Sequence, residues 1–138
     1  MDGSEIHAVS VVVTHGMRFL LVRRGRAPAR GRFAFPGGRV EPGETASQAA
    51  QRELREETGL IARSLAPLRE IVVDGEAGQR YRLEVFHGTD IEGTLAAGDD
   101  ADLVGWYSIE EMHSLPVTES TQAMAETIAA GFHGRDLP

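Results

Sequence analysis

The chain has 138 residues, of which 41% are hydrophobic and 25% charged, so it can bury the core of one folded domain and is not a disordered chain. It contains no cysteine, which excludes disulfides, thiolate metal sites and cysteine nucleophiles. Its net charge is −7, divided between +5 over residues 1–40 and −12 over residues 41–138, whereas a general nucleic-acid binder is expected to be basic overall.

All 14 basic residues are arginine, and seven of them lie in the first forty residues. This distribution suits a small anionic substrate that is met by guanidinium groups and by metal ions held on carboxylates. Residues 1–10 lack the basic start and apolar centre of a secretory signal, and no run is long enough to span a membrane. We therefore expect a cytoplasmic single domain over residues 1–138, without membrane or stable nucleic-acid partners, and compatible with a homodimer.

The first predicted elements are two strands. Residues 9–14 are β-branched and apolar, as in a buried strand, and the turn at His15 and Gly16 leads into a second strand over residues 17–22. We expect these two strands to form a hairpin. The Gly- and Pro-containing segment 23–32 then predicts a loop.

The clearest predicted helix follows a second Gly-rich loop. Thr45 and Gln48 match a capping box, and alanines with Leu54 favour a helix through Thr58. Gly59 stands where a left-handed cap residue belongs.

The rest of the chain predicts three strands and two helices. Ser108 and Glu111 form a second capping box, which opens a short helix that ends before Pro116. The remaining elements are strands over residues 61–74, 79–89 and 104–107 and a helix over residues 119–130. Strands and helices in this order predict a single α/β (α+β) unit, with a sheet covered by helices on two sides.

Three carboxylates converge on the predicted helix. At 100° per residue, Glu53 and Glu57 share the stripe of the apolar helix residues, and Glu56 lies at its margin. Carboxylates this close repel one another, and partial burial raises the cost of each charge. A hard cation such as Mg²⁺ or Mn²⁺ removes that cost. The alternative is a solvated acidic face with surface pairs such as Arg52 with Glu56, but the position of the acids on the apolar stripe favours a metal site.

The run GRVEPGETASQAAQRELREETGL, residues 38–60, resembles the complete Nudix box. Gly38 is followed after five residues by Glu44, and after seven more by the segment RELREETGL. The flanking segments FAFPGG and GWY agree, so the resemblance covers roughly residues 8–130. It implies the α/β/α Nudix sandwich, with a mixed sheet between helices and the box forming a loop, a helix and a loop.

The resemblance also implies a Mg²⁺-dependent hydrolase, with Mn²⁺ able to substitute. Glu56 and Glu57 are the firmest metal ligands that it implies, and Glu53 is a further ligand or the group that deprotonates the attacking water. Arg52 would position the glutamates through ion pairs, and Glu44 would support the loop. The full implied ligand set is Gly38 through its carbonyl, Glu53, Glu56, Glu57 and an acidic residue from outside the box.

For that outside acidic residue we choose Asp100, from the cluster at residues 99–102 that precedes Trp106. A solvated turn is an equally good reading of this cluster, because Gly and Asp are ordinary turn residues.

The predicted loop before the box carries the candidate substrate-binding arginines. They meet the distal phosphate or sugar of the substrate, or else they only solubilise the loop. Trp106 or Phe35 could stack a base, although core positions suit both side chains better. The candidate arginines are Arg23, Arg24, Arg26 and Arg32, with Arg30 beside them.

Three functions fit these residues. The first is hydrolysis of the phosphoanhydride of a nucleoside diphosphate linked to another moiety, as in ADP-ribose. The approach to the box most resembles the ADP-ribose pyrophosphatase-like branch of the family. The second is hydrolysis of a (d)NTP to its monophosphate and pyrophosphate, as in nucleotide-pool cleansing. The third is a non-catalytic nucleotide sensor, which the presence of all three glutamates disfavours.

Overall fold

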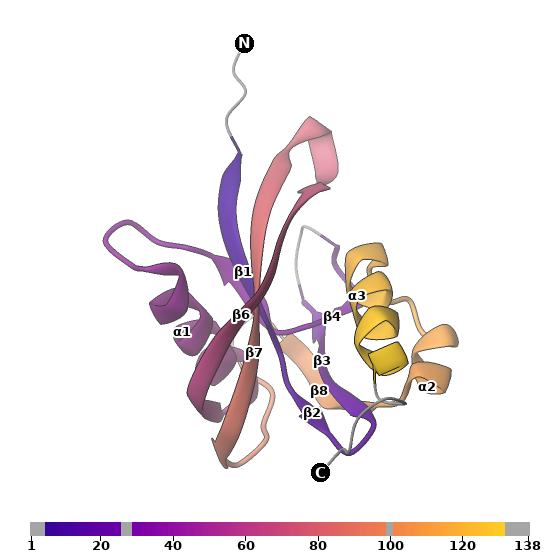
Figure 1. Ribbon diagram of the computed structural model, residues 1–138. Helices are drawn as coiled ribbons and strands as arrows, with labels where there is room; N and C mark the ends of the chain where they lie inside the picture. Colours follow the sequence, from indigo (N-terminus) through magenta and orange to yellow (C-terminus); the bar gives the residue numbers. More distant parts are fainter. Residues whose placement is uncertain (1–4, 26–28, 99–100, 132–138) are drawn as a thin grey trace.

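The computed structural model describes residues 5–25, 29–98 and 101–131, which form both strands and helices (Figure 1). The strands are β1 (Ile6–Val12), β2 (Thr14–His15), β3 (Arg18–Arg24), β4 (Phe33–Ala34), β5 (Gly37–Arg39), β6 (Leu60–Asp74), β7 (Arg80–Gly93) and β8 (Ala101–Tyr107). The helices are α1 (Ala46–Thr58), α2 (Ile109–His113) and α3 (Glu119–Ala130), and a short 3₁₀ turn, Glu76–Gly78, joins β6 to β7.

The strands form two sheets. The first has the order β5-β1-β7-β6 and is mixed, because β1 pairs parallel with β7 while the other two pairings are antiparallel. In the second, β3 pairs antiparallel with β2, β4 and β8.

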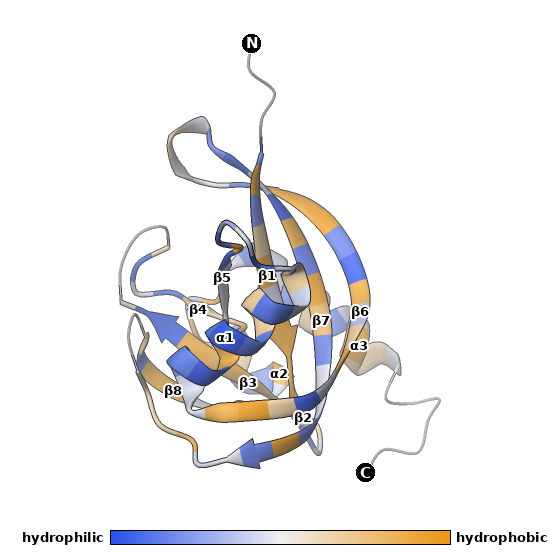
Figure 2. Ribbon diagram, turned by 90° about the vertical axis from the view of Figure 1, so that its left-hand side faces the viewer, coloured by the Kyte–Doolittle hydropathy of each residue, from blue (hydrophilic) through white to orange (hydrophobic). Residues whose placement is uncertain are grey.

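Helices cover the first sheet on both sides, with α1 on one side and α2 and α3 on the other (Figure 1). One apolar cluster joins Val9 and Val11 of β1 to Leu54 of α1, and a second joins Val12 to residues of α2 and α3. Figure 2 shows that the outward side of α1 is hydrophilic, as expected for a helix that buries only one stripe. The predicted α/β/α sandwich with a mixed sheet is therefore confirmed.

The predicted hairpin at the start of the chain is only partly correct. Its turn exists, but only the two residues of β2 pair with β3. All seven residues of β1 instead pair with β7, from Ile6 opposite Tyr81 to Val12 opposite His87. The predicted loop over residues 23–32 is also shorter than expected, because β3 continues through Arg24. A partner more than seventy residues away leaves no local signal in the sequence.

The predicted helix ends are confirmed. At the start of α1, the Gln48 N–H donates to Thr45 Oγ1 at 3.0 Å, and the Thr45 N–H donates to Gln48 Oε1 at 2.9 Å. Gly59 ends the helix with a φ of 77°, in the left-handed region. Ser108 and Glu111 form the second capping box. These caps fix where α1 begins and ends, and so they fix the depth of the glutamates along it.

Candidate active site

Helix α1 presents its three glutamates at different depths. Glu57 is buried and only 5% exposed, whereas the side chain of Glu53 is 13% exposed and that of Glu56 is 34% exposed. This order follows the helical wheel, on which Glu57 shares the buried stripe and Glu56 lies at its margin. The structure therefore has one carboxylate in the interior and one at the surface, with Glu53 between them.

Two glycines of β5 bring the backbone up to these carboxylates. The Gly37 N–H donates to Glu57 Oε1 at 3.3 Å. A Cβ atom at Gly38 would lie 2.3 Å from Glu53 Oε2, so a side chain at Gly38 would displace that carboxylate. Gly38 therefore lies directly beside Glu53.

Arg52, in the middle of α1, contacts acidic residues both on the helix and in the loop before it. Its Nε and Nη2 atoms donate to both oxygens of Glu44 at 2.6 and 3.0 Å, as a bidentate pair. Its Nη1 atom donates to Glu53 at 2.9 Å and to Glu56 at 3.2 Å, and Nη2 also donates to the carbonyl of Arg39 at 3.0 Å. One guanidinium thus contacts three carboxylates: Glu53 and Glu56, which the resemblance led us to expect, and Glu44, for which only support of the loop was expected.

The electrostatics of the site follow from burial and from these contacts. Burial, with the neighbouring carboxylate of Glu53 as the next cause, raises the pKa of Glu57 from 4.5 to about 8, while the positive charge of Arg24 acts in the opposite direction. Burial also raises the pKa of Glu53. The hydrogen bond from Arg52 lowers the pKa of Glu44 to about 2. The inner two glutamates are therefore costly to ionise, whereas Glu44 is firmly ionised.

This donor set fits a hard divalent cation. Oxygen atoms of carboxylates are the ligands that Mg²⁺ and Mn²⁺ prefer, and a cation would offset the repulsion between Glu53 and Glu57. Within the described residues, no three acidic or histidine side chains are already gathered as a ligand cluster. Instead, the carboxylates of Glu53 and Glu56 accept hydrogen bonds from Arg52, and that of Glu57 accepts one from the Gly37 N–H.

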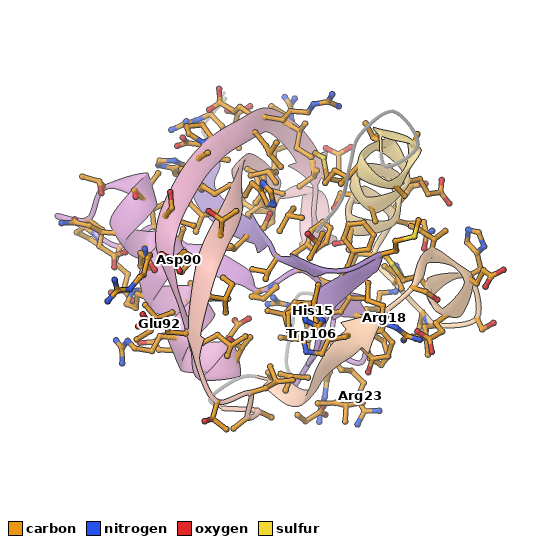
Figure 3. The ribbon with its side chains drawn as sticks, turned by 60° about the horizontal axis from the view of Figure 1, so that its bottom comes forward. His15, Arg18, Arg23, Asp90, Glu92 and Trp106 are labelled. Atoms are coloured by element: carbon orange, nitrogen blue, oxygen red, sulfur yellow. The ribbon has the colours of Figure 1, made fainter. Side chains whose placement is uncertain are left out.

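The structure separates the candidate arginines. Arg24, at the end of β3, lies close enough to Glu57 to influence the pKa of its carboxyl. Arg23 instead donates from Nε to Asp102 Oδ1 at 2.8 Å, and Figure 3 shows its side chain beside β8. Among the candidate arginines that the structure describes, Arg24 is therefore the one whose charge is seen to act on a glutamate.

The structure does not connect the remaining candidate residues to the glutamates. Arg32 is exposed, and it lines a shallow groove of about 520 Å³ with Glu119 and Gln122 of α3. Arg30 is exposed too. Arg26 and Asp100 lie outside the described residues.

The two aromatic candidates are packed rather than open. Phe35 is 5% exposed and belongs to the cluster under α2 and α3, 6.2 Å from the ring of Phe19. Trp106 packs against the α1 cluster, and its ring lies 5.7 Å from that of His15 (Figure 3). The expected core position is confirmed for Phe35, whereas Trp106 is only partly buried.

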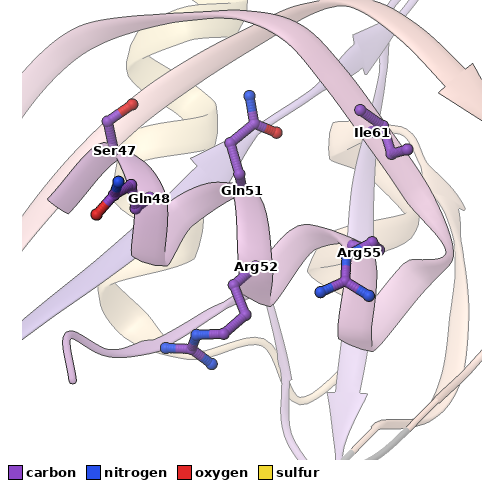
Figure 4. A pocket seen from close by; sticks show the side chains of 6 residues that line it. All are labelled: Ser47, Gln48, Gln51, Arg52, Arg55 and Ile61. Carbon is purple, nitrogen blue, oxygen red and sulfur yellow. The ribbon is translucent and has the colours of Figure 1, made fainter. Parts of the chain in front are cut away.

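A groove of about 450 Å³ lies on the outer side of α1 (Figure 4). None of its lining residues is a carboxylate, so it is not where the chemistry described above would take place. It is lined by Ser47, Gln48, Gln51, Arg52, Arg55 and Ile61.

Comparison with known proteins gives the family. A family model described as the NUDIX domain matches residues 5–130. The chain belongs to the Nudix family. It is 34% identical over 109 residues to the ADP-ribose pyrophosphatase of Methanocaldococcus jannaschii, over 78% of this chain and 64% of that protein. It is 33% identical over 129 residues to the CTP pyrophosphohydrolase of Escherichia coli, over 91% of this chain and 92% of that protein.

A solved structure gives the same fold. A MutT NUDIX hydrolase from Burkholderia pseudomallei matches with a TM-score of 0.83 at 23% identity, over 91% of this chain and 98% of that one. The named relatives that this domain matches are hydrolases, and members of the Nudix family generally use divalent metals such as Mg²⁺. The chain spans less than two thirds of the archaeal relative's length. No helix among the described residues has the length and apolar character of a membrane span.

One contact of the Nudix site was not predicted from the sequence. Gly37 had been read only as part of the approach to the box, yet its N–H is the group that meets Glu57. The close approach of strand β5 to the helix decides this contact. The only local signal is the glycine pair itself, which allows a backbone to come near other groups.

The raised pKa of Glu57 predicts how the stability of the metal-free protein depends on pH. Between pH 4.5 and about 8, the folded protein holds a proton that the unfolded chain has lost, so the free energy of unfolding falls as pH rises. We expect a decrease on the order of a few kcal/mol. Glu44 acts in the opposite direction only at the acidic end of this window, because once the pH is well above 4.5 its carboxyl is ionised in both states.

Urea unfolding in a chelator at pH 5, 6.5 and 8 measures this dependence. The variant Glu57→Gln, which cannot ionise, should show a flatter profile. Equal slopes for the wild type and the variant would mean that Glu57 is ionised at neutral pH.

Proposed function

We propose that this Nudix pyrophosphohydrolase uses Mg²⁺ to cleave the phosphoanhydride of a nucleoside diphosphate linked to another moiety, such as ADP-ribose. The observation that carries the proposal is the pair of the buried Glu57 and the partly buried Glu53, set against β5, with the positive charge of Arg24 nearby. The name of the archaeal relative, ADP-ribose pyrophosphatase, supports this substrate class.

The second candidate substrate is a nucleoside triphosphate, cleaved to its monophosphate and pyrophosphate. It is favoured by the near full-length match to a protein named CTP pyrophosphohydrolase. The same glutamates would serve both reactions, because each breaks a phosphoanhydride bond. The two candidates differ in the group that lies beyond the diphosphate.

In the proposed mechanism, Glu53, Glu56 and Glu57 would hold the metal, together with the Gly38 carbonyl. The cation would supply positive charge that offsets the charge of the diphosphate. Arg52 keeps Glu53 and Glu56 in place through the contacts described above. Glu53, partly exposed and of raised pKa, is suited to accept the proton of the attacking water.

Product analysis tests the proposal. The protein is incubated with Mg²⁺ or Mn²⁺ and ADP-ribose, other nucleoside diphosphate sugars, dinucleoside polyphosphates and (d)NTPs, and the released phosphates and nucleotides are identified. Cleavage of ADP-ribose to AMP and ribose phosphate supports the first candidate, and release of pyrophosphate from CTP supports the second. Absence of metal-dependent cleavage across the whole panel would contradict both.

Arg24 should bind the substrate rather than act in the chemical step. We expect Arg24→Ala to raise KM by about tenfold with a smaller change in kcat, because a charge-assisted contact to phosphate is lost. Arg23→Ala is the matched control, since Arg23 pairs with Asp102 and should leave KM unchanged. Equal KM values for the two variants would show that Arg24 does not bind the substrate and only keeps the loop soluble.

A further inference from the structure

Ser10 has a buried hydroxyl without a partner. The residue is 7% exposed, and within the described part of the chain its Oγ is the one buried side-chain polar atom that lacks a hydrogen bond. Such atoms are uncommon, because burying a hydroxyl without a partner costs free energy. An alanine at this position would avoid that cost, so the hydroxyl calls for an explanation.

The position of Ser10 connects it to the Nudix site. On β1 it lies opposite Gly37 of β5, and Gly37 donates its N–H to Glu57. The two strands are in close contact, since a Cβ atom at Gly37 would lie 2.9 Å from Ser10 Cα. The residue that carries the hydroxyl is therefore the direct cross-strand neighbour of Gly37, which contacts the innermost glutamate, Glu57.

The side of the sheet that Ser10 faces follows from strand alternation. Val9 and Val11 belong to the cluster beneath α1, and Val12 belongs to the cluster beneath α2 and α3. Ser10 shares the face of Val12, because side chains two residues apart point the same way. Its neighbour across the parallel pairing, Val85, belongs to that second cluster as well. Ser10 is thus a polar residue on the apolar face that α2 and α3 cover, and its link to the metal site is Gly37, the residue across from it, whose N–H meets Glu57.

We propose that Ser10 is a specificity-determining residue that hydrogen-bonds the nucleoside half of the substrate, next to the diphosphate held at Glu57. This inference rests on the proposed function. A hydroxyl both donates and accepts, so it can pair with a sugar hydroxyl or with a polar edge of the base. Because Oγ is covered, the side chains over it must move when the substrate binds.

The test compares Ser10→Ala with Ser64→Ala, a matched change at an exposed residue of β6. For Ser10→Ala we expect KM to rise about 3- to 10-fold with kcat nearly unchanged, as for loss of one neutral hydrogen bond. The midpoint of thermal unfolding should stay the same or rise, because no bond within the protein is lost. Ser64→Ala should change neither quantity.

Substrate pairs then identify the group that Ser10 contacts. If it is the sugar, the wild type prefers ribonucleotides over their 2′- or 3′-deoxy forms, and Ser10→Ala removes that preference. If it is the base, the loss depends on the base and not on the sugar. Unchanged KM values for every substrate would overturn the proposal and assign the hydroxyl to a buried water only.

Binding of nucleoside monophosphates, measured by calorimetry, separates this inference from the proposed function. If the wild type cleaves nothing in the panel, the proposed function fails, while weaker monophosphate binding by Ser10→Ala would still support the role of Ser10. Equal dissociation constants for the variant and the wild type, or no binding to either, would overturn it.

Discussion

Replacing Glu57 with glutamine is expected to lower kcat by roughly two to three orders of magnitude while the protein stays folded. Glutamine has the same shape and still accepts the N–H of Gly37, but it removes the charge that would bind the cation. Because Glu57 is buried and costly to ionise, the metal-free variant should be at least as stable as the wild type at pH 8. Loss of activity together with retained stability would show that Glu57 serves the reaction rather than the fold, and the dependence on Mg²⁺ concentration tests its role as a metal ligand.

Glu110→Gln is the matched control for this prediction. Glu110 is an exposed residue of α2, and the same change there should leave kcat unaltered. The assay is steady-state hydrolysis with a saturating substrate and a titration of Mg²⁺. Near-full activity of Glu57→Gln at every metal concentration would show that the buried carboxylate is not a metal ligand.

Replacing Arg52 with glutamine should affect both stability and activity. The guanidinium is 18% exposed and contacts Glu44, Glu53 and Glu56, so its loss leaves three carboxylates near one another without their shared cation. We expect the free energy of unfolding to fall by roughly 2–4 kcal/mol. We expect kcat to fall by about 10- to 100-fold, because the glutamates lose the group that orients them.

Arg82→Gln is the control for Arg52→Gln. Arg82 pairs with Glu70 and Glu84 at the surface, where such contacts contribute less than about 1 kcal/mol. Chemical denaturation and hydrolysis assays on both variants provide the comparison. If Arg52→Gln were as stable and as active as Arg82→Gln, the network around Arg52 would have no positioning role. Arg52→Lys should be intermediate, since lysine keeps the charge but cannot form the bidentate pair.

Helix α1 and its caps could be predicted because their causes are local. The capping pairs lie three residues apart, and the glutamates fall on one face through the helical repeat, so spacing alone places them. The start of the chain was predicted less well, since residues 9–14 carry the same apolar pattern whichever strand they pair with. The parallel partner of β1, more than seventy residues away, is chosen by packing between two layers.

The sequence by itself determined the family of this protein, the ends of its helices and the row of glutamates on α1. Only the tertiary structure decided that Glu57 is buried against Gly37, that Arg24 rather than Arg23 lies near it, and that the Ser10 hydroxyl has no partner among the described residues. The physical reason is that helical periodicity and caps depend on residues within one or two turns. Burial, hydrogen bonding and pKa depend instead on which distant strands are brought together.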